Sequence, residues 1–198
     1  MTRAMYGGRT TLGIALVVAV CGVIAAAVYG AIGSTLGRLW DYVADPVVSF
    51  RNAIPDVPMV MLLGKIFPPG FMTMVVLLVL VNRVGGVRFT RAALLGSGTN
   101  SESTTGSPVL SGLSALTVAA AVYAGWAIMV ETAVSYLGLG IQPPMPSWGN
   151  MLSNAQQYFF SAPWLVFAPG LLIGLAVLSL SLIADGLRRV PAWAGIGR

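Results

Sequence analysis

The sequence predicts an all-α fold, a polytopic transmembrane helical bundle of about five spans with an external N-terminus and a cytoplasmic C-terminus. Composition is the first reason, because 57% of the 198 residues are hydrophobic, only 9% are charged and the mean hydropathy is +0.84. A soluble domain of this size would lack polar surface. The second reason is the length of the uncharged runs, since residues 103–130 alone would form about 42 Å of helix, more than a bilayer core requires. We treat residues 1–198 as a single transmembrane domain.

The first span is expected at residues 11–33. Residues 10–37 carry no charge, and this run is far longer than the roughly 7 to 15 apolar residues of a cleaved signal peptide, so we expect a retained helix. Cys21 lies within it as the only cysteine of the chain. It therefore offers neither a disulfide framework nor a set of metal ligands.

Residues 54–83 are expected to form two short, tilted helices rather than one continuous span. Pro68, Pro69 and Gly70 divide the segment, because proline removes a backbone donor and glycine costs helix entropy. Each half is short for a helix that faces lipid alone, but both would fit inside a packed bundle.

The last two spans are expected at residues 107–130 and 163–184. In the second of these, Pro169 and Gly170 are expected to interrupt the helix near its start. Three charged residues are then expected to close it, namely Asp185, Arg188 and Arg189.

The distribution of basic residues supports a count of five. With the N-terminus outside, the cytoplasmic segments hold eight basic residues and the external segments hold three, as the positive-inside rule requires. A single crossing by residues 54–83 would scramble this bias. The eight are Arg38, Arg51, Arg83, Arg88, Arg91, Arg188, Arg189 and Arg198, and the three are Arg3, Arg9 and Lys65.

Aromatic residues near the expected span ends fit contact with the lipid bilayer. Trp148, Tyr158 and Trp164 are expected in an outer interfacial belt, and Trp40 and Trp193 in an inner one. Such residues anchor a membrane protein and carry no chemistry.

Several function classes are excluded by what the sequence contains. Its eleven basic residues are scattered between apolar runs rather than clustered, so we expect no nucleic-acid partner. There is no histidine and no Gly-rich phosphate loop, so we expect no enzyme activity, no cofactor and no metal site. Asp41 and Asp45, four residues apart, would repel one another and more readily flank a cytoplasmic helix than bind a metal.

The most informative segment is residues 131–149. A lone carboxylate, Glu131, ends the apolar run, and a Gly/Pro/Trp-rich stretch follows, so we expect a short tail of helix and then an ordered turn. An intramembrane carboxylate could face a substrate path and attract a cationic peptide amino group or a metal ion. It could equally lie in the headgroup zone or hydrogen-bond within a subunit interface, and its place at a span end favours this structural role.

From Glu131 onward the sequence resembles the C-type permease subunits of bacterial ABC importers for dipeptides, oligopeptides and nickel. That family has a glutamate after an apolar helix, a Gly-Leu-Gly turn, Pro-Pro and a Pro-Ser-Trp-Gly element. The matching residues here are Glu131, Gly138, Gly140, Pro143, Pro144, Trp148 and Gly149, with Ser161 to Trp164 and Asp185 to Arg188 matching the last helix and its cytoplasmic exit.

The resemblance implies a multi-pass protein of the bacterial plasma (inner) membrane that imports its substrate by alternating access. It also implies three kinds of protein partner: a second permease subunit, ATP-binding cassette ATPase subunits, and an extracytoplasmic substrate-binding protein. Any ATP hydrolysis would then occur in the partner ATPases. Peptide and nickel permeases share these motifs, so the motifs do not identify the substrate.

Two departures from the family are expected to matter. The family has a further N-terminal helix, whereas this chain begins where the second family helix begins. The cytoplasmic loop at residues 84–107 stands where the family has a Glu-Ala-Ala coupling helix that inserts into the ATPase, and its second half is rich in Gly, Ser and Thr, which form helices poorly. The candidate ATPase-coupling residues are Arg88, Arg91, Ala92, Ala93 and Gly96, with arginine where the family has glutamate.

Three functional hypotheses follow. In the first, the chain is a permease subunit, and Arg88 and Arg91 face water or acidic groups of the ATPase. In the second, it is a non-transporting membrane scaffold or regulatory subunit derived from such a permease, and the two arginines merely anchor the inner membrane face. The third, an unrelated small carrier or channel, predicts transport without nucleotide and is disfavoured by the motifs of the last third.

Overall fold

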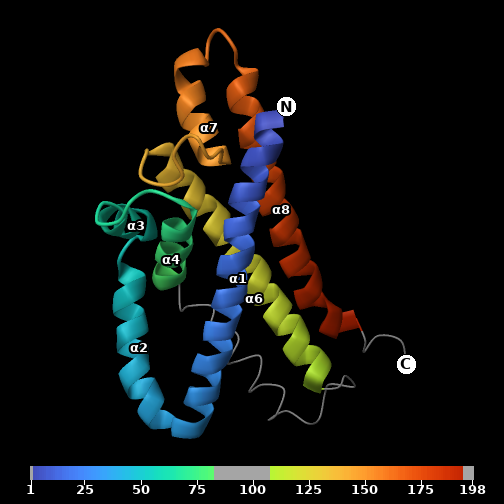
Figure 1. Ribbon diagram of the computed structural model, residues 1–198. Helices are drawn as coiled ribbons and strands as arrows, with labels where there is room; N and C mark the ends of the chain where they lie inside the picture. Colours follow the sequence, from blue (N-terminus) through green and yellow to red (C-terminus); the bar gives the residue numbers. More distant parts are fainter. Residues whose placement is uncertain (1, 83–107, 194–198) are drawn as a thin grey trace.

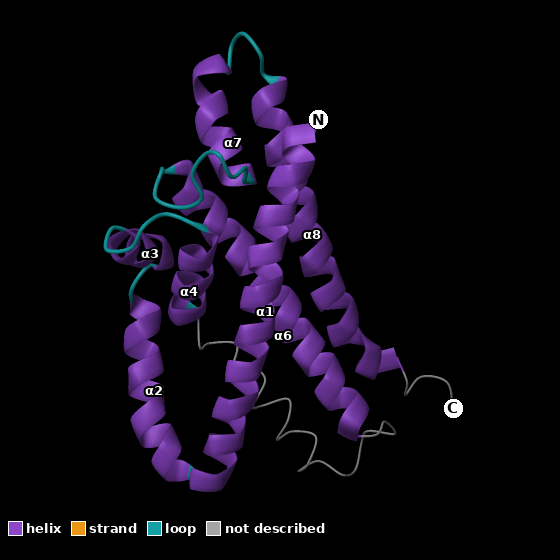
Figure 2. Cartoon of the chain, in the orientation of Figure 1, coloured by secondary structure: helices purple, strands orange, loops and turns teal. Residues whose placement is uncertain are grey.

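The computed structural model describes residues 2–82 and 108–193, and these two segments contain helices and no strand (Figure 2). Several helices follow apolar runs of the sequence, while Gly37, Pro55 and Gly70 precede helix starts as breakers of the preceding segment. The elements are α1 (Thr2–Leu36), α2 (Arg38–Ala53), α3 (Asp56–Gly64), α4 (Phe71–Val81), α6 (Pro108–Tyr136), α7 (Trp148–Ala155), the 3-10 turn η1 (Gln156–Tyr158) and α8 (Trp164–Trp193).

The helices form an up-and-down bundle (Figure 1). Helix α1 runs the length of the molecule, and α2 turns back beside its far half. Helix α4 packs against α1, and α3 packs against α4 and α6. Helix α6 returns toward the N-terminal end, where α7 continues outward, and α8 then runs back along α6. The start of α1 and the end of α8 therefore lie at opposite ends of the bundle.

Helix α6 is the centre of the core. It contacts α1, α3, α4, α7 and α8, and 56% of the residues in its most apolar stretch are buried, against only 6% in the corresponding stretch of α8. Close van der Waals packing of apolar side chains inside the bundle stabilises the contact of α6 with its neighbours. The largest fully buried apolar side chains are Ile14, Val18, Val60, Met74, Leu77, Leu78, Val81, Ile128, Val134 and Ile141.

Three helices are long and apolar enough to cross a membrane, namely Thr2–Gly33, Leu116–Tyr136 and Trp164–Leu187 in the described part of the chain. They coincide with the three long spans expected from sequence. The division of residues 54–83 into two helices, α3 and α4, is also confirmed. With 9 and 11 residues these helices measure about 14 and 17 Å, well short of a bilayer core of about 30 Å. Five crossings thus remain a prediction.

Helix α2 is an element that the sequence analysis did not assign. Its 16 residues include Pro46 and the charged residues Arg38, Asp41, Asp45 and Arg51, and these hide the helix from a hydropathy criterion. It carries the chain from the end of α1 back to α3, which lies across the end of α2, and α4 then runs back along the bundle.

The expected interruption of the last span by Pro169 and Gly170 is wrong. Helix α8 is continuous from Trp164 to Trp193, and its apolar span ends at Leu187, among the charged residues expected to close it. Pro169 is only the sixth residue of the helix, so the proline removes one backbone bond, to the carbonyl of Leu165, close to an end where such bonds are incomplete in any case.

Candidate functional site: a buried carboxylate between three helices

Glu131 lies one turn before the end of α6 and is completely buried. Both carboxylate oxygens accept hydrogen bonds from hydroxyl groups. Thr11 Oγ1 of α1 donates to Oε2 at 3.1 Å, and Ser135 Oγ donates to Oε1 at 2.7 Å. The hydroxyl of Ser147, the residue before α7, lies close to the carboxylate. The carboxylate therefore joins α1 and α6 directly, at the point where α7 begins.

Each of the first two hydroxyls also accepts a backbone hydrogen bond. The N–H of Trp148 donates to Thr11 Oγ1 at 3.3 Å, and the N–H of Ile141 donates to Ser135 Oγ at 2.9 Å. A hydroxyl has a single hydrogen to give, so both must give it to Glu131. Two parallel chains of donors, amide to hydroxyl to carboxylate, thus converge on one side chain, and we name this set of five residues the Glu131 node.

Trp148 fastens the start of α7 to the start of α1. Its indole Nε1 donates to the carbonyl of Ala4 at 3.0 Å, and its side chain is 4% exposed. The ring lies against Gly7 and Gly8, and a Cβ added at Gly8 would stand 3.0 Å from Cζ2 of the ring. The expected place of Trp148 in an outer interfacial belt is therefore wrong, because its amphipathic ring is buried against the start of α1. Tyr158 and Trp164 are exposed, as a belt requires.

The motif glycines have separate physical reasons. Gly138 has φ +84°, a left-handed conformation that favours glycine, just after α6 ends. Gly140 and Gly149 permit close approach to α6. A Cβ at Gly149 would lie 2.6 Å from the carbonyl oxygen of Thr132, and one at Gly140 would collide with Ser135. These two glycines let the turn and α7 pack directly on the last turns of α6.

The turn between α6 and α7 is ordered, and α6 ends at Tyr136, only five residues after Glu131, as expected. Ser147 and Asn150 form a reciprocal capping box at the start of α7. The amide of Asn150 also donates to the carbonyls of Ile141 and Met145, at 3.2 and 2.7 Å, so one side chain both caps α7 and closes the turn. Pro143 and Pro144, which are joined by a cis peptide bond, occupy its exposed edge.

The structure brings together only part of the predicted residue set. Glu131, Gly140, Trp148 and Gly149 converge on the Glu131 node, whereas Asp185 and Arg188 lie near the opposite end of the bundle, on α8. The predicted coupling residues fall outside the described residues, namely Arg88, Arg91, Ala92, Ala93 and Gly96. The whole loop 84–107 also falls outside the described residues, and α6 begins directly after it, at Pro108.

Sequence reasoning missed Thr11, Gly7 and Gly8, which α1 contributes to the node and to the seat of Trp148. A signal was present. Two glycines and a threonine, spaced three and four residues apart, share one face of a helix, and such small residues often mark a close helix contact in membrane proteins.

A second polar cluster, also unpredicted, joins α2, α3, α4 and α6. Arg51 forms an ion pair with Asp56 at 3.0 Å and donates to the carbonyl of Val81, while the indole Nε1 of Trp126 donates to Asp56 at 2.9 Å. Asp56 opens α3, where the helix dipole favours a negative charge. Arg51 was expected to be one of the cytoplasmic arginines. Its guanidinium instead contacts Asp56 and Val81 within the bundle.

The Glu131 node fits neither a metal site nor a catalytic centre. A metal ion needs several free ligands, but this carboxylate is surrounded by hydroxyl donors, and the described residues contain no cluster of three His, Cys, Asp or Glu side chains. General acid or base chemistry needs access to a reacting group, which a fully buried side chain lacks. The arrangement can connect helices.

Comparison with known proteins identifies the family. No protein-family model matches the chain. The chain is 35% identical over 202 residues to the dipeptide transport system permease protein DppC of Escherichia coli K12, over 95% of this chain and 67% of the relative. It is 30% identical to DppC of Alkalihalophilus pseudofirmus, over 94% of this chain and 66% of the relative. It is also 30% identical to the di/tripeptide transport system permease protein DppC of Pseudomonas aeruginosa, over 95% and 66%.

The chain spans about two thirds of the length of these relatives, and the similarity extends over nearly all of it. The fold agrees, because long apolar helices dominate the described residues. This chain therefore belongs to the DppC family, the C-type permease subunits of peptide ABC importers.

Proposed function

We propose that this chain is the C-type permease subunit of a peptide importer in a bacterial plasma membrane, and that it moves peptides by alternating access. The observation that carries this proposal is identity of 30 to 35% over about 95% of the chain to proteins named as dipeptide or di/tripeptide permeases. These names support a peptide cargo over nickel.

Transport by this subunit requires partners. The sequence contains no Gly-rich phosphate loop, so the energy for import would come from two ATPase subunits in other chains. A second permease would complete the translocation path, and an extracytoplasmic binding protein would deliver the peptide. The outer end of the bundle, where α7 and the start of α8 project, is the face that such a binding protein would meet.

Within this function, Glu131 serves as a structural joint rather than a cargo site. Its burial and its two hydroxyl donors support this role, because a side chain that binds the amino group of a peptide must present a free oxygen to the transport path. The joint ties α1 and α7 to α6, so these three helices would move as one body during alternating access.

The test is reconstitution. The chain is co-expressed with candidate second permeases and ATPases, the complex is purified in nanodiscs, and ATP hydrolysis is measured with and without a peptide-loaded binding protein. We expect co-purification of the partners and a several-fold stimulation by the loaded binding protein. Failure to co-purify with any permease and ATPase pair would sink the proposal, and stimulation by nickel alone would replace peptide as the cargo.

A second candidate, a non-transporting scaffold or regulatory subunit, is favoured by one feature of the sequence. Arg91 stands where the family has the glutamate of its coupling helix, and a Gly/Ser/Thr-rich segment follows. A rigid coupling element would be needed to convert ATPase closure into helix movement. If Arg88→Ala with Arg91→Ala abolishes the stimulated ATPase rate while the complex stays assembled, the loop couples. An assembled complex that the loaded binding protein never stimulates would favour the scaffold.

A further inference from the structure

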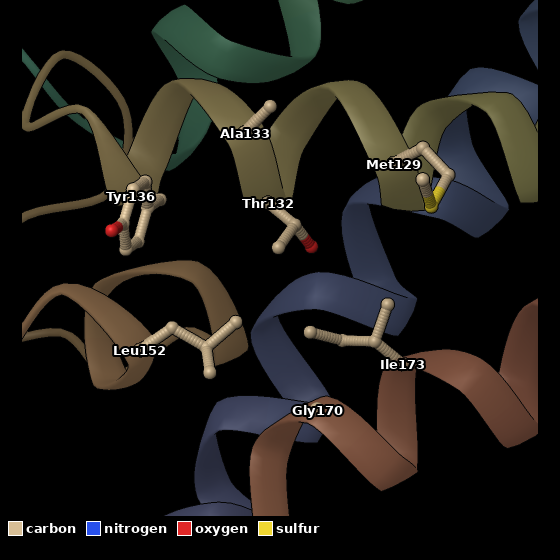
Figure 3. A pocket seen from close by; sticks show the side chains of 7 residues that line it. All are labelled: Met129, Thr132, Ala133, Tyr136, Leu152, Gly170 and Ile173. Carbon is tan, nitrogen blue, oxygen red and sulfur yellow. The ribbon is translucent and has the colours of Figure 1, made fainter. Parts of the chain in front are cut away.

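A furrow runs along the crevice between α6 and α8. Its outer part is a cavity of about 400 Å³ under α7, and Figure 3 shows Thr132 of α6, Leu152 of α7 and Ile173 of α8 around it. Its inner part is a second cavity of about 310 Å³, between the middle of α6 and the later turns of α8. Met129 lines both cavities, so the two lie next to each other along the crevice, and we call them together the furrow.

Two glycines provide the width of the furrow. Gly170 of α8 lines the outer cavity and Gly125 of α6 lines the inner one, and a Cβ added at either would meet no atom within 4 Å. Measured along α8 from Gly170 to Ala184, the furrow is about 21 Å long at 1.5 Å per residue. That length exceeds the depth of one leaflet of a hydrocarbon core, about 15 Å, so the furrow is long enough for one acyl chain.

The polarity of the furrow has a direction. Nearly all of the lining is apolar, but Thr132 Oγ1, in the outer cavity, is buried without a hydrogen-bond partner. In the inner cavity, the hydroxyl of Ser181 is already bonded to the carbonyl of Val177 at 2.9 Å, and the indole N–H of Trp126 to Asp56. A ligand therefore finds a free donor at the outer end and only apolar contacts below it.

We propose that this furrow binds one acyl chain of an outer-leaflet phospholipid, with an ester carbonyl of the lipid accepting from the Thr132 hydroxyl. The furrow lies between two helices that are long and apolar enough to cross a membrane. The face of α8 that points away from the bundle is exposed. Residues 132–184 carry no charge, so nothing on the α8 wall would pair with the charged ends of a peptide. A helix of a partner, at a diameter of about 10 Å, would rest on the rim instead of filling the furrow.

The site is independent of cargo and of ATP, and it rests only on insertion of α6 and α8 in a bilayer. A lipid in this position would fill a gap that α6 and α8 leave open, and it would support α8, which has few buried residues of its own. Movement of α8 relative to α6 would then depend on the presence of the lipid chain.

The test uses the full chain, with whatever subunits co-purify, in nanodiscs that contain a trace of phosphatidylethanolamine with a photoreactive diazirine in one acyl chain. After irradiation, mass spectrometry locates the labelled residues. We expect labelling of Met129, Leu152 and Ile173 several-fold above that of Leu175 and Leu178, which are exposed on the same helix α8.

Two plugs and one control make the result specific. Gly170→Leu fills the outer cavity and Gly125→Leu the inner one, and each should lower labelling of the furrow several-fold. Gly186→Leu adds the same side chain on the opposite face of α8, where there is also open space but no furrow, and should change nothing. Equal labelling over the whole of α8, or labelling that neither plug reduces, overturns the proposal. Furrow residues cross-linked to a co-purified protein, or a lipid displaced by peptide cargo, also overturn it.

Discussion

At the scale of single residues, several of the few polar side chains of the bundle form hydrogen bonds that connect helices. Glu131 is fully buried yet accepts from hydroxyls on α1 and α6. Burying a charge without such partners is costly, and each hydrogen bond to a charged group contributes about 1.5 to 3 kcal/mol. The value of the carboxylate therefore lies in its complete set of donors, and small chemical changes to it should be measurable.

Glu131→Gln should lower the free energy of unfolding by about 2 kcal/mol, because the amide group would present a donor to a hydroxyl that is already a donor. Thr11→Val, which removes only the α1 arm, should cost less. Denaturation of the purified protein in detergent measures both. A Glu131→Gln variant that loses peptide transport while keeping its full stability would contradict the structural role and restore the cargo-binding one.

The Arg51–Asp56 pair makes a second prediction at this scale. Asp56→Asn should cost about 3 kcal/mol of stability, because it leaves the half-buried guanidinium of Arg51 without its counter-charge. Trp126→Phe, which keeps the packing but loses one donor to Asp56, should cost only about 1 kcal/mol. Thermal unfolding of the two variants side by side gives the comparison. Equal effects would show that the ion pair stabilises the bundle no more than the indole hydrogen bond does.

At the scale of elements, contact between α6 and α7 depends on missing side chains. Gly149 lies against the backbone of Thr132, and Gly140 against Ser135, so α7 and its preceding turn reach α6 without intervening atoms. Shorter helices with few apolar contacts need such close approach, because α7 has only eight residues with which to hold its place.

Gly149→Ala should destabilise the protein by about 1 to 3 kcal/mol and loosen α7, because the new methyl group would lie 2.6 Å from a backbone oxygen that has little room to move. Gly174→Ala, in open space on α8, is the matched control and should be neutral or slightly stabilising. Unfolding midpoints and limited proteolysis of the turn at residues 137–147 report the two effects. Resistance of Gly149→Ala to proteolysis equal to that of the unaltered protein would show that α7 does not depend on the close contact.

The predictability of these elements follows from the kind of signal that each one carries. Hydropathy located the three long helices, and the prolines and glycine at residues 68–70 located the division between α3 and α4. Helix α2 escaped because its charged residues resemble a loop to a hydropathy criterion. Pro169 misled because a proline near the start of a helix costs only one bond there.

The site was predictable to a similar degree. Glu131 and the motif residues after it could be selected from sequence because an acidic side chain beside an apolar run is rare. For their partner Thr11 the signal was weaker, because Gly7, Gly8 and Thr11 on one helix face mark a close helix contact but not the residue 120 positions away that Thr11 meets. Burial of Trp148 was equally hidden, since the same ring would serve in an interfacial belt.

At the scale of the whole molecule, the arrangement gives the bundle two unlike ends. The end with α7 contains the Glu131 node and the uncharged turns around it. The other end contains the turn between α1 and α2 and the last turns of α8. With eight of eleven basic residues assigned to cytoplasmic segments, the sequence favours placing this second end inside, although Arg51 is now engaged within the bundle.

This orientation predicts a labelling pattern. In a Cys21→Ala background, Asn154→Cys, at an exposed position of α7, should react with a membrane-impermeant maleimide applied to intact cells. Thr35→Cys, near the end of α1, should not react. Permeabilised cells supply the control, because both cysteines should then react. The reverse pattern in intact cells would invert the topology, and reaction of both would remove α1 as a full membrane crossing.

The bond between Thr11 and Glu131 also bears on how the protein is made. Its two halves are separated by 120 residues, so on the ribosome α1 is complete long before α6 emerges. A carboxylate that enters the bilayer alone is costly, but one that enters beside a waiting hydroxyl is less so. Helix α6 is thus expected to leave the insertion machinery in contact with α1. Helix α1 would then guide the insertion of a helix that is synthesised more than 70 residues after α1 ends. This contact is therefore expected to affect the order in which the helices assemble as well as the stability of the folded bundle.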